Sequence, residues 1–258
     1  MNPPASWLLL VDPPADGPTN MARDEALLHA AERSGLHALR LYGWNPGTLS
    51  FGRNEPAARR YDRAVIERRG IATVRRPTGG RAVWHHREVT YAVAAPTRSF
   101  GSLQQSYQEI HAMLAAALQR LGAPVALAGP RGATPLGAGA CFAAPAGGEV
   151  VTPAGGKVVG SAQVRSGGAF LQHGSIILEN DQPLVDALVA GTSAPSQATG
   201  LGTLVPAATA ERVTAAIADE ARVRWHLDAP GAAWPDDLLL DAQERIPAFR
   251  SDAWTWRR

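Results

Sequence analysis

Two residue types occur only once in the chain, and both fall between Cys141 and Leu178. Cys141 is the only cysteine, and Lys157 is the only lysine beside 24 arginines. A lysine amine can give up its proton and forms a compact point charge, whereas an arginine stays charged and planar. We therefore interpret Lys157 in two ways: as a chance survivor of a preference for arginine, or as a titratable amine or small cation required in a tight site.

The lone cysteine has three possible roles. It cannot form an internal disulfide, so it is buried filler, a metal ligand or a nucleophile. Its surroundings, GAGACFAAPAGG, are rich in Gly, Ala and Pro, which predicts a loop. A loop thiol beside a cation has a lowered pKa and becomes reactive. On the residues alone, a nucleophile and structural filler both remain open for Cys141.

Length and composition place the chain among globular proteins. Its 258 residues suit one α/β domain or two small ones, and 45% apolar with 19% charged residues is typical of soluble proteins. The sequence contains no run of about 18 apolar residues, so we expect no membrane span. The start, MNPPASWLLLVDPP, lacks the basic segment and cleavage-like site of a signal peptide, so with one cysteine we expect a cytoplasmic protein. The seven histidines are scattered without cysteine partners, and we expect no metal site.

Positive charge is concentrated in residues 53–87, which carry ten arginines and three acidic residues. Such an excess favours an anionic partner, either nucleic acid, a nucleotide or an acidic protein. The alternative is a solvated helix face in which arginine replaces lysine. No motif with the spacing for groove reading or base stacking accompanies the arginines, so we expect no nucleic-acid partner.

The elements before residue 77 alternate between strands and helices. A helix begins at the capping residues Thr19 and Asn20 and ends at Gly35. Asp24 and Glu25 lie in its first turns, where the helix dipole explains acidic residues without any function. The other expected elements are a strand over 7–11, two strands over 37–44 and 48–53 joined by a turn at 45–47, a basic helix over 59–70 and a strand over 71–76.

The stretch from Arg75 to His85 predicts a strand, a Pro-Thr-Gly-Gly turn and a second strand. Paired glycines allow backbone amides to approach a ligand closely, and the flanking arginines can hold a phosphate or carboxylate. The pattern is weak evidence for a binding site, because Gly-Gly hairpin turns are common. The stretch also does not open a helix, as a phosphate-binding loop would.

The second half of the chain contains Cys141 and Lys157, and its expected elements place them in a loop and at the start of a strand. We expect an amphipathic helix over 102–121 and a loop over 123–148 that carries Cys141. Three strands, 149–151, 157–165 and 169–178, form one expected antiparallel meander, with Lys157 at the start of the second. We interpret His111 as a packed helix residue, and His173 as a core histidine for which a ligand role stays open. The expected later elements are a helix over 182–190, a loop over 191–205, a helix over 206–224 and a helical stretch after residue 235.

Six motifs, in order along residues 7–180, resemble the lipoate–protein ligase A/B family, and most closely its cysteine-dependent octanoyltransferases of the LipM type. The motifs are DEALL (24–28), LRLYGWNPGTLSFG (39–52), RRPTGGRAVWH (75–85), VTYAV (89–93), CFAAP (141–145) and GKVVGSAQVR with FLQHGSIIL (156–178). The resemblance implies an α/β (α+β) fold like the catalytic domain of biotin ligases and class II synthetases, with a largely antiparallel mixed sheet and flanking helices. It implies one catalytic domain over 1–258, with a core over 7–180 and a helical part over 181–258.

The resemblance also implies an activity. Such enzymes move an octanoyl group from octanoyl–acyl carrier protein to a lysine of a lipoyl domain, such as the glycine cleavage H protein or 2-oxoacid dehydrogenase E2. Cys141 matches the nucleophile and Lys157 the lysine of the family's GK motif, and no cofactor is expected. The arginines of 53–87 would meet the acidic carrier, and we expect a monomer that does not bind membranes. The residues implied to bind substrate are Arg75, Arg76, Thr78, Gly79, Gly80, His85, Gly160, Ser161, Ala162, His173 and Gly174.

Two departures and three alternatives remain. His86 stands where the family often has Asp, and the segment from Cys141 to Lys157 has one extra residue, with Gly147 and Gly148 where bulkier residues are usual. An ATP- and Mg-dependent lipoate ligase would use Lys157 on an adenylate and leave Cys141 incidental. A lipoyl amidotransferase would use similar chemistry. A non-catalytic acyl- or nucleotide-binding relative is disfavoured, because both singular residues are present.

Overall fold

A five-stranded sheet forms the centre of the protein. The structure, a computed structural model, describes residues 7–129, 148–190, 196–227 and 231–257. The outer pair β1–β2 is parallel, and the other three pairs are antiparallel, which confirms the expected fold class. In spatial order the strands are β1 (Trp7–Val11), β2 (His37–Tyr42), β6 (Glu88–Pro96), β10 (Ala169–Ile177) and β9 (Val159–Ser166).

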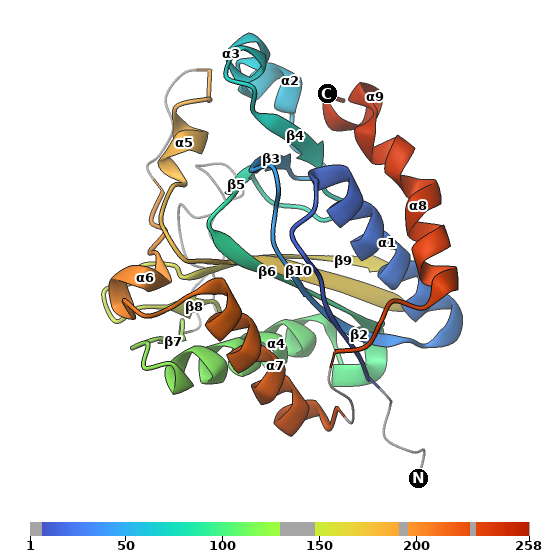
Figure 1. The fold of residues 1–258 in the computed structure, drawn as a ribbon, viewed down its shortest axis with the longest axis vertical. Helices are drawn as coiled ribbons and strands as arrows, with labels where there is room; N and C mark the ends of the chain where they lie inside the picture. The colour runs from blue at the N-terminus through green and yellow to red at the C-terminus, as the bar shows by residue number, and fades with distance from the viewer. Residues whose placement is uncertain (1–6, 130–147, 191–195, 228–230, 258) are drawn as a thin grey trace.

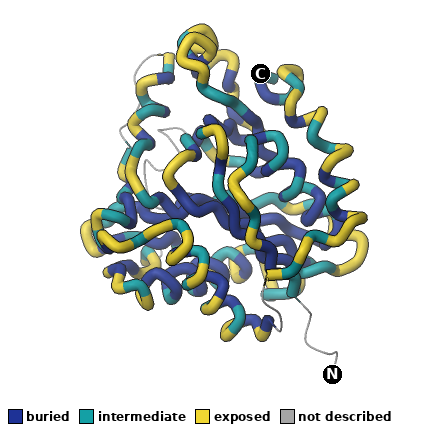
Figure 2. The backbone as a smooth tube through the Cα atoms, viewed as in Figure 1, coloured by how far each residue is buried: buried dark blue, intermediate teal, exposed yellow. Residues whose placement is uncertain are grey.

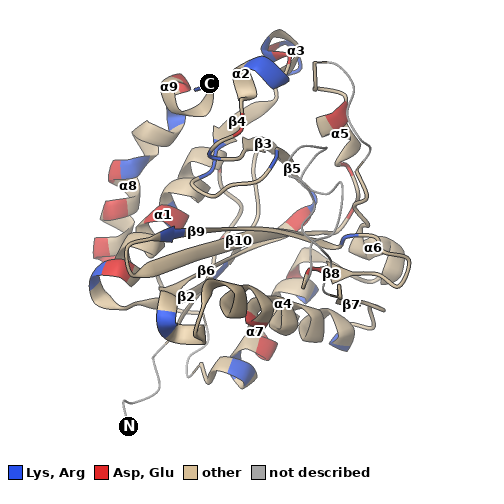
Figure 3. Ribbon diagram, turned by 180° about the vertical axis from the view of Figure 1, so that it is seen from behind, with Lys and Arg blue, Asp and Glu red and all other residues tan. Residues whose placement is uncertain are grey.

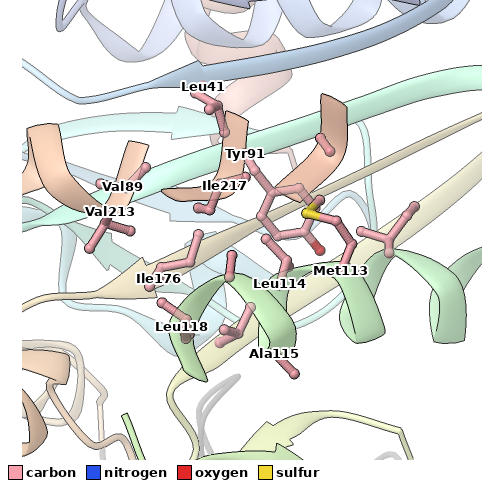
Figure 4. Close-up of a cluster of buried hydrophobic side chains, with 14 of the residues drawn as sticks. Leu41, Val89, Tyr91, Met113, Leu114, Ala115, Leu118, Ile176, Val213 and Ile217 are labelled. Carbon is pink, nitrogen blue, oxygen red and sulfur yellow. The ribbon is translucent and has the colours of Figure 1, made fainter. Parts of the chain in front are cut away.

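Helices cover both faces of this sheet (Figure 1). On one face lie α1 (Gly17–Ser34) and α8 (Asp236–Arg250), and on the other lie α4 (Leu103–Arg120) and α7 (Ala210–Trp225). Strand β6 is buried on both sides: Tyr91 and Val93 face the α4–α7 core, and Ala92 and Ala94 face the α1 core. Figure 4 shows Tyr91 among the side chains of the α4–α7 core. The buried backbone in Figure 2 accordingly follows the central strands, and most of the exposed backbone lies at the periphery.

A second, three-stranded sheet lies beside the first. It has β3 (Thr48–Phe51) in the middle, parallel to β4 (Ala72–Arg75) and antiparallel to β5 (Val83–His85). The expected strand–turn–strand over 75–85 is therefore wrong as a hairpin, because its two strands lie on opposite sides of β3. The expected neighbours 37–44 and 48–53 likewise belong to different sheets.

The loop that crosses the end of β3 needs two glycines. Gly80 has φ +91°, a left-handed conformation that glycine adopts without strain. A Cβ on Gly52 would collide with the carbonyl oxygen of Gly80. The backbone amide of Arg53 donates to the carbonyl of Thr78 at 2.7 Å. Residues 77–80 are thus held against the end of β3 by backbone contacts.

Two short helices replace the expected basic helix over 59–70. They are α2 (Ala57–Arg60) and α3 (Arg63–Arg68), and Asp62 caps α3 by accepting from the amide of Val65. A 3₁₀ turn, η1 (Thr97–Phe100), precedes α4, which begins and ends almost where the sequence predicts.

The expected three-stranded meander is also wrong. The two-residue strand β8 (Val150–Val151) pairs with β7 (Ala126–Leu127) in a separate small sheet, and only β9 and β10 form the predicted antiparallel pair. Strand β9 begins at Val159, so Lys157 lies two residues ahead of it, in isolated bridges to Val151 and Ala198.

The C-terminal part packs on the rest of the protein. Helix α5 (Pro183–Asp186) is shorter than expected, and α6 (Leu201–Leu204) lies where the sequence predicts only loop. Leu238 and Phe249 of α8 join the core beneath α1, and α9 (Asp252–Thr255) follows. Within the described ranges, no helix is long and apolar enough to cross a bilayer.

Candidate active site

A narrow pocket lies where the two sheets meet. Seven of the predicted substrate-binding residues line it: Arg76, His85, Gly160, Ser161, Ala162, His173 and Gly174. The remaining lining residues are Met21, Tyr42, Trp44, Val83, Thr90 and Ser175. The pocket therefore combines apolar and aromatic side chains with a few buried polar groups, as small-molecule sites do.

One wall of the pocket is bare backbone. Gly174 on β10 lies opposite Ser161 on β9 and Tyr91 on β6. A Cβ on Gly174 would collide with the carbonyl of Gly160 and stand 2.6 Å from Oγ of Ser161. Glycine at this position therefore preserves the wall, because any side chain would displace the neighbouring strand.

His85 is held by its neighbours on all sides. Its Nδ1 lies 2.8 Å from Glu88, its Nε2 lies 2.7 Å from Oγ of Ser50, and its ring stacks on Trp44 with centroids 4.0 Å apart. Arg76 donates to the same Ser50 hydroxyl at 2.7 Å and to backbone carbonyls. These contacts fix the pocket's polar side before any ligand enters.

His173 connects the pocket to helix α1. Its Nδ1 lies 2.8 Å from Oδ2 of Asp24, and its Nε2 lies 2.6 Å from Oγ1 of Thr78. Asp24 is completely buried and also accepts from Arg40 at 2.7 Å and Tyr42 at 2.8 Å. Burial lowers the pKa of His173. Burial acts to raise the pKa of Asp24, but the hydrogen bond from His173 and the charge of Arg40 outweigh it, and the net pKa lies below its usual value.

The dipole interpretation of Asp24 is therefore wrong. The helix begins at Gly17, two residues earlier than expected, with Asp16 as its capping residue, and its first turn contains no acidic residue. Asp24 lies in the second turn, on the face that packs against the sheet, where its carboxylate binds three donors.

Arg75, Thr78, Gly79 and Gly80 lie outside the pocket lining, although Thr78 contacts the lining residue His173. The guanidinium of Arg75 is buried and donates to carbonyls of Gly52, Glu55 and three residues at the C-terminus, Trp254, Thr255 and Arg257. The structure therefore uses Arg75 to fasten the C-terminal segment, and its expected contact with substrate stays a prediction. A Cβ on Gly79 would meet nothing within 4 Å, so space is open beside this residue.

Lys157 is buried beside a carboxylate. Its Nζ donates to Oε1 of Glu149 at 2.6 Å, and the hydroxyl of Tyr107 donates to the same oxygen at 3.3 Å. The backbone of Lys157 is fixed on both sides, because its amide donates to Gln197 and its carbonyl accepts from Thr199. The ammonium is thus an ordered charge in a mostly desolvated place.

Comparison with protein families matches residues 16–222 to the lipoyl protein ligase A/B catalytic domain. The chain belongs to this family. Its relatives include the octanoyltransferase LipM of Moorella thermoacetica, 43% identical over 76% of this chain and 72% of the relative. The octanoyltransferase LipM of Kyrpidia tusciae is 38% identical over 98% of this chain and 99% of the relative.

Solved structures show the same fold at low identity. A lipoate protein ligase from T. acidophilum with bound lipoic acid has a TM-score of 0.81 at 18% identity, and each chain is covered to 98%. Lipoate-protein ligase A bound with ATP has a TM-score of 0.80 at 19% identity, with the same coverage.

Cys141, the predicted nucleophile, and residues 130–147 of the loop expected over 123–148 lie outside the described residues. Gly148 is the first described residue after that segment. In the described part of that expected loop, Ala126–Leu127 form the strand β7. His86, the departure from the family's motif, is exposed and lies 3.3 Å from Asp181. Among the described residues, no group of three or more His, Cys, Asp or Glu side chains forms a candidate metal site.

The sequence did not reveal several residues that contact the predicted site residues. Asp24, Glu88 and Glu149 each accept a hydrogen bond from a predicted site residue or lie within hydrogen-bonding distance of one. His111, interpreted as a packed helix residue, lies 2.8 Å from Oγ of the pocket residue Ser161. The available signal was spacing: His111 follows Tyr107 by four residues, so both face the same side of α4.

Proposed function

We propose that the protein transfers an octanoyl group from octanoyl–acyl carrier protein to a lysine of a lipoyl domain, through a thioester on Cys141. Relatives that are octanoyltransferases support the acyl group and the reaction class. The observation that carries the proposal is the pairing of the only lysine with Glu149 at a buried site apart from the pocket lining. His111 links the Lys157–Glu149 pair to the pocket, because it lies 2.8 Å from the pocket residue Ser161 and the charge of Lys157 helps to lower its pKa.

The pocket suits an aliphatic chain that ends in a polar carbonyl group. Met21, Tyr42, Trp44 and Val83 offer apolar surface. Burying each CH₂ group contributes about 0.8 kcal/mol, so an acyl chain gains binding energy from its length.

The proposed reaction has two steps. The Cys141 thiolate attacks the donor carbonyl, a C–S bond to Cys141 forms, and the carrier leaves as its thiolate. A lysine amine of the lipoyl domain then attacks the acyl-enzyme, a C–N bond forms, the C–S bond to Cys141 breaks so that Cys141 leaves as thiolate, and the proton of the amine passes to water. In both steps the Lys157 ammonium stabilises the negative charge that develops on the carbonyl oxygen. A thioester is already activated, so the proposal requires neither ATP nor a metal.

The proposed partners are the acidic carrier and lipoyl-domain proteins such as the glycine cleavage H protein and 2-oxoacid dehydrogenase E2, in the cytoplasm. A solved structural neighbour is described as a bipartite lipoate protein ligase with its E2 lipoyl domain, from Thermoplasma acidophilum. Of the arginines in 53–87, Arg75 and Arg76 are buried, whereas Arg53, Arg59 and Arg68 are exposed. Figure 3 shows basic residues at α2 and α3, where we place the carrier.

The first experiment is intact-mass spectrometry after mixing the protein with octanoyl–acyl carrier protein without ATP. We expect one octanoyl adduct that hydroxylamine removes and that Cys141→Ala does not form. Transfer that survives in Cys141→Ala contradicts the thioester route. Modification of a lipoyl domain only with ATP and a free acid identifies a ligase, and modification only from an octanoylated lipoyl domain identifies an amidotransferase.

A further inference from the structure

Two side chains of α4 hold two consecutive residues that lead to Lys157. Nδ1 of His111 lies 2.9 Å from the carbonyl oxygen of Gly148, and the hydroxyl of Tyr107 donates to the carboxylate of Glu149 at 3.3 Å. The two rings meet edge to face with centroids 4.1 Å apart. The amide of Gly148 donates to Ala128, so this residue is held through both of its backbone polar groups.

The contacts of His111 fix its tautomer. A carbonyl oxygen only accepts, so Nδ1 carries the proton that is donated to Gly148. Burial, opposed by the bond to Gly148 and assisted by the charge of Lys157, lowers the pKa of His111 to about 3. The ring is therefore neutral near pH 7, and its Nε2 accepts from the hydroxyl of Ser161 at 2.8 Å.

A chain of side chains sets the direction of the remaining protons. The amide nitrogen of Gln163 donates to Gln172 at 3.2 Å, and that of Gln172 donates to the hydroxyl of Tyr91 at 3.0 Å. The Tyr91 hydroxyl lies 2.7 Å from Oγ of Ser161, whose own proton is directed to His111. Each hydrogen bond in this series is therefore donated in the direction of His111, and the last one is donated by His111 to the carbonyl of Gly148.

We propose that His111 is a positioning residue for Lys157. By holding the carbonyl of Gly148 it places Glu149, and Glu149 in turn holds the ammonium at 2.6 Å. The effect on catalysis rests on the proposed function, but the effect on the ammonium does not. The ring's bond to Gly148, and not its bond to Ser161, is the contact that matters for Lys157.

Four substitutions separate the two bonds. In His111→Asn the amide nitrogen takes the place of Nδ1 and keeps the bond to Gly148, whereas in His111→Gln the amide oxygen takes the place of Nε2 and keeps the bond to Ser161. His111→Leu loses both. Ser106→Ala is the matched control, because Ser106 is buried on the same helix and its hydroxyl donates to the carbonyl of Ser102, away from Gly148 and Ser161.

The first readout needs no substrate. Lys157 is the only lysine, so protein labelled with ¹⁵N and ¹³C in lysine gives a single side-chain resonance. We expect this resonance to keep its position in His111→Asn and Ser106→Ala, and to move in His111→Leu, His111→Gln and Glu149→Gln. A resonance that stays in place in a folded His111→Leu variant, or that moves equally in His111→Asn, overturns the proposal.

The second readout is the rate of octanoyl-enzyme formation. We expect a loss on the order of a hundredfold in His111→Leu and His111→Gln, as for a misplacement of about 1 Å, and recovery to within tenfold of wild type in His111→Asn. Tyr107→Phe removes a single hydroxyl on a half-buried side chain, the one that α4 directs to Glu149. If the His111 variants do not fold, this variant tests whether the contacts of α4 with Gly148 and Glu149 place Lys157. A Lys157 resonance that does not move in Tyr107→Phe contradicts the proposal. If wild type forms no octanoyl-enzyme, the proposed function fails while the resonance pattern still decides the role of His111.

Discussion

Replacing Asp24 by Asn tests whether this buried carboxylate belongs to the site. Its Oδ1 accepts from Arg40, and its Oδ2 accepts from Tyr42 and lies 2.8 Å from Nδ1 of His173. An Asn side chain offers only one acceptor oxygen and places an amide NH₂ against a donor on the other side. To avoid that clash, His173 must move its proton to Nε2, which changes its bond to Thr78.

The free-energy cost of the change follows from the burial of Arg40. This guanidinium is completely buried and, among the described residues, keeps Asp12 at 2.7 Å as its anionic partner once Asp24 is neutral. Breaking a buried ion pair typically costs about 3–5 kcal/mol of unfolding free energy. Because Asp12 remains, we expect a loss of about 3 kcal/mol.

The adjacent Glu25 provides the matched control. Its ion pair with Arg245 is 3.2 Å long, and the two side chains are 26% and 24% exposed. Such partly solvated pairs contribute less than about 1 kcal/mol. Glu25→Gln therefore removes one negative charge at the next position of the same helix with a much smaller effect on stability.

Urea unfolding at pH 7 measures both variants. Because the folded-state pKa of Asp24 is lowered, its carboxylate stabilises the protein above the unfolded pKa of about 3.9, and this contribution is lost as the pH falls through the folded value. The gap between wild type and Asp24→Asn should therefore close in acid. An Asp24→Asn variant that unfolds within about 1 kcal/mol of Glu25→Gln would refute the reasoning.

Three further predictions concern pH, the pocket wall and the carrier. The pKa of His111 is about 3, so the neutral ring's contribution to stability is complete above the unfolded value near 6.5 and falls by about 3 kcal/mol between pH 7 and pH 4. Urea unfolding at these two pH values should show that His111→Asn loses this pH dependence. A variant whose stability falls between pH 7 and pH 4 as much as that of wild type argues against the assignment. Gly174→Ala should cost about 1–3 kcal/mol of stability and abolish octanoyl transfer, whereas Gly79→Ala should unfold like wild type, so that any rise in its KM reports contact with substrate. Arg59→Glu with Arg68→Glu should raise the KM for octanoyl–acyl carrier protein several-fold and weaken its salt dependence, and the exposed Arg120→Glu serves as the control that should not.

The sequence predicted most elements because their signals are local. Helix α4 has a capping serine, an apolar stripe and a glycine beyond its end, and the structure places it at Leu103–Arg120. The alternation in residues 157–178 predicted β9 and β10, and their pairing followed from the short turn between them. Seven predicted site residues meet in one pocket because the motifs that contain them form strands of the two adjoining sheets.

What the sequence did not reveal depends on contacts between distant segments. The partner of β4 is β3, about two dozen residues earlier, and no local pattern specifies such a parallel pair. Arg75 and Arg76 are adjacent and look equivalent, yet Arg75, the last residue of β4, binds the C-terminal segment, whereas Arg76, directly after the strand, lines the pocket. Asp24 was misjudged because its three donors come from two strands, β2 and β10, rather than from its own helix.

The site depends on polar bonds that cross between its two sheets. Thr78, beyond the end of the small sheet, lies 2.6 Å from His173 of the large one, and Nδ1 of His85 in the small sheet lies 2.8 Å from Glu88 in the large one. Polar groups that line the pocket therefore already have hydrogen-bond partners within the protein. The partner of Lys157 is Glu149, which directly precedes β8 and also accepts a hydrogen bond from Tyr107 of α4. In the proposed reaction, binding of the chain and stabilisation of the charge thus fall to different elements. We therefore expect mutations of the pocket lining other than Gly174 mainly to change KM, and mutations around Glu149 mainly to change kcat.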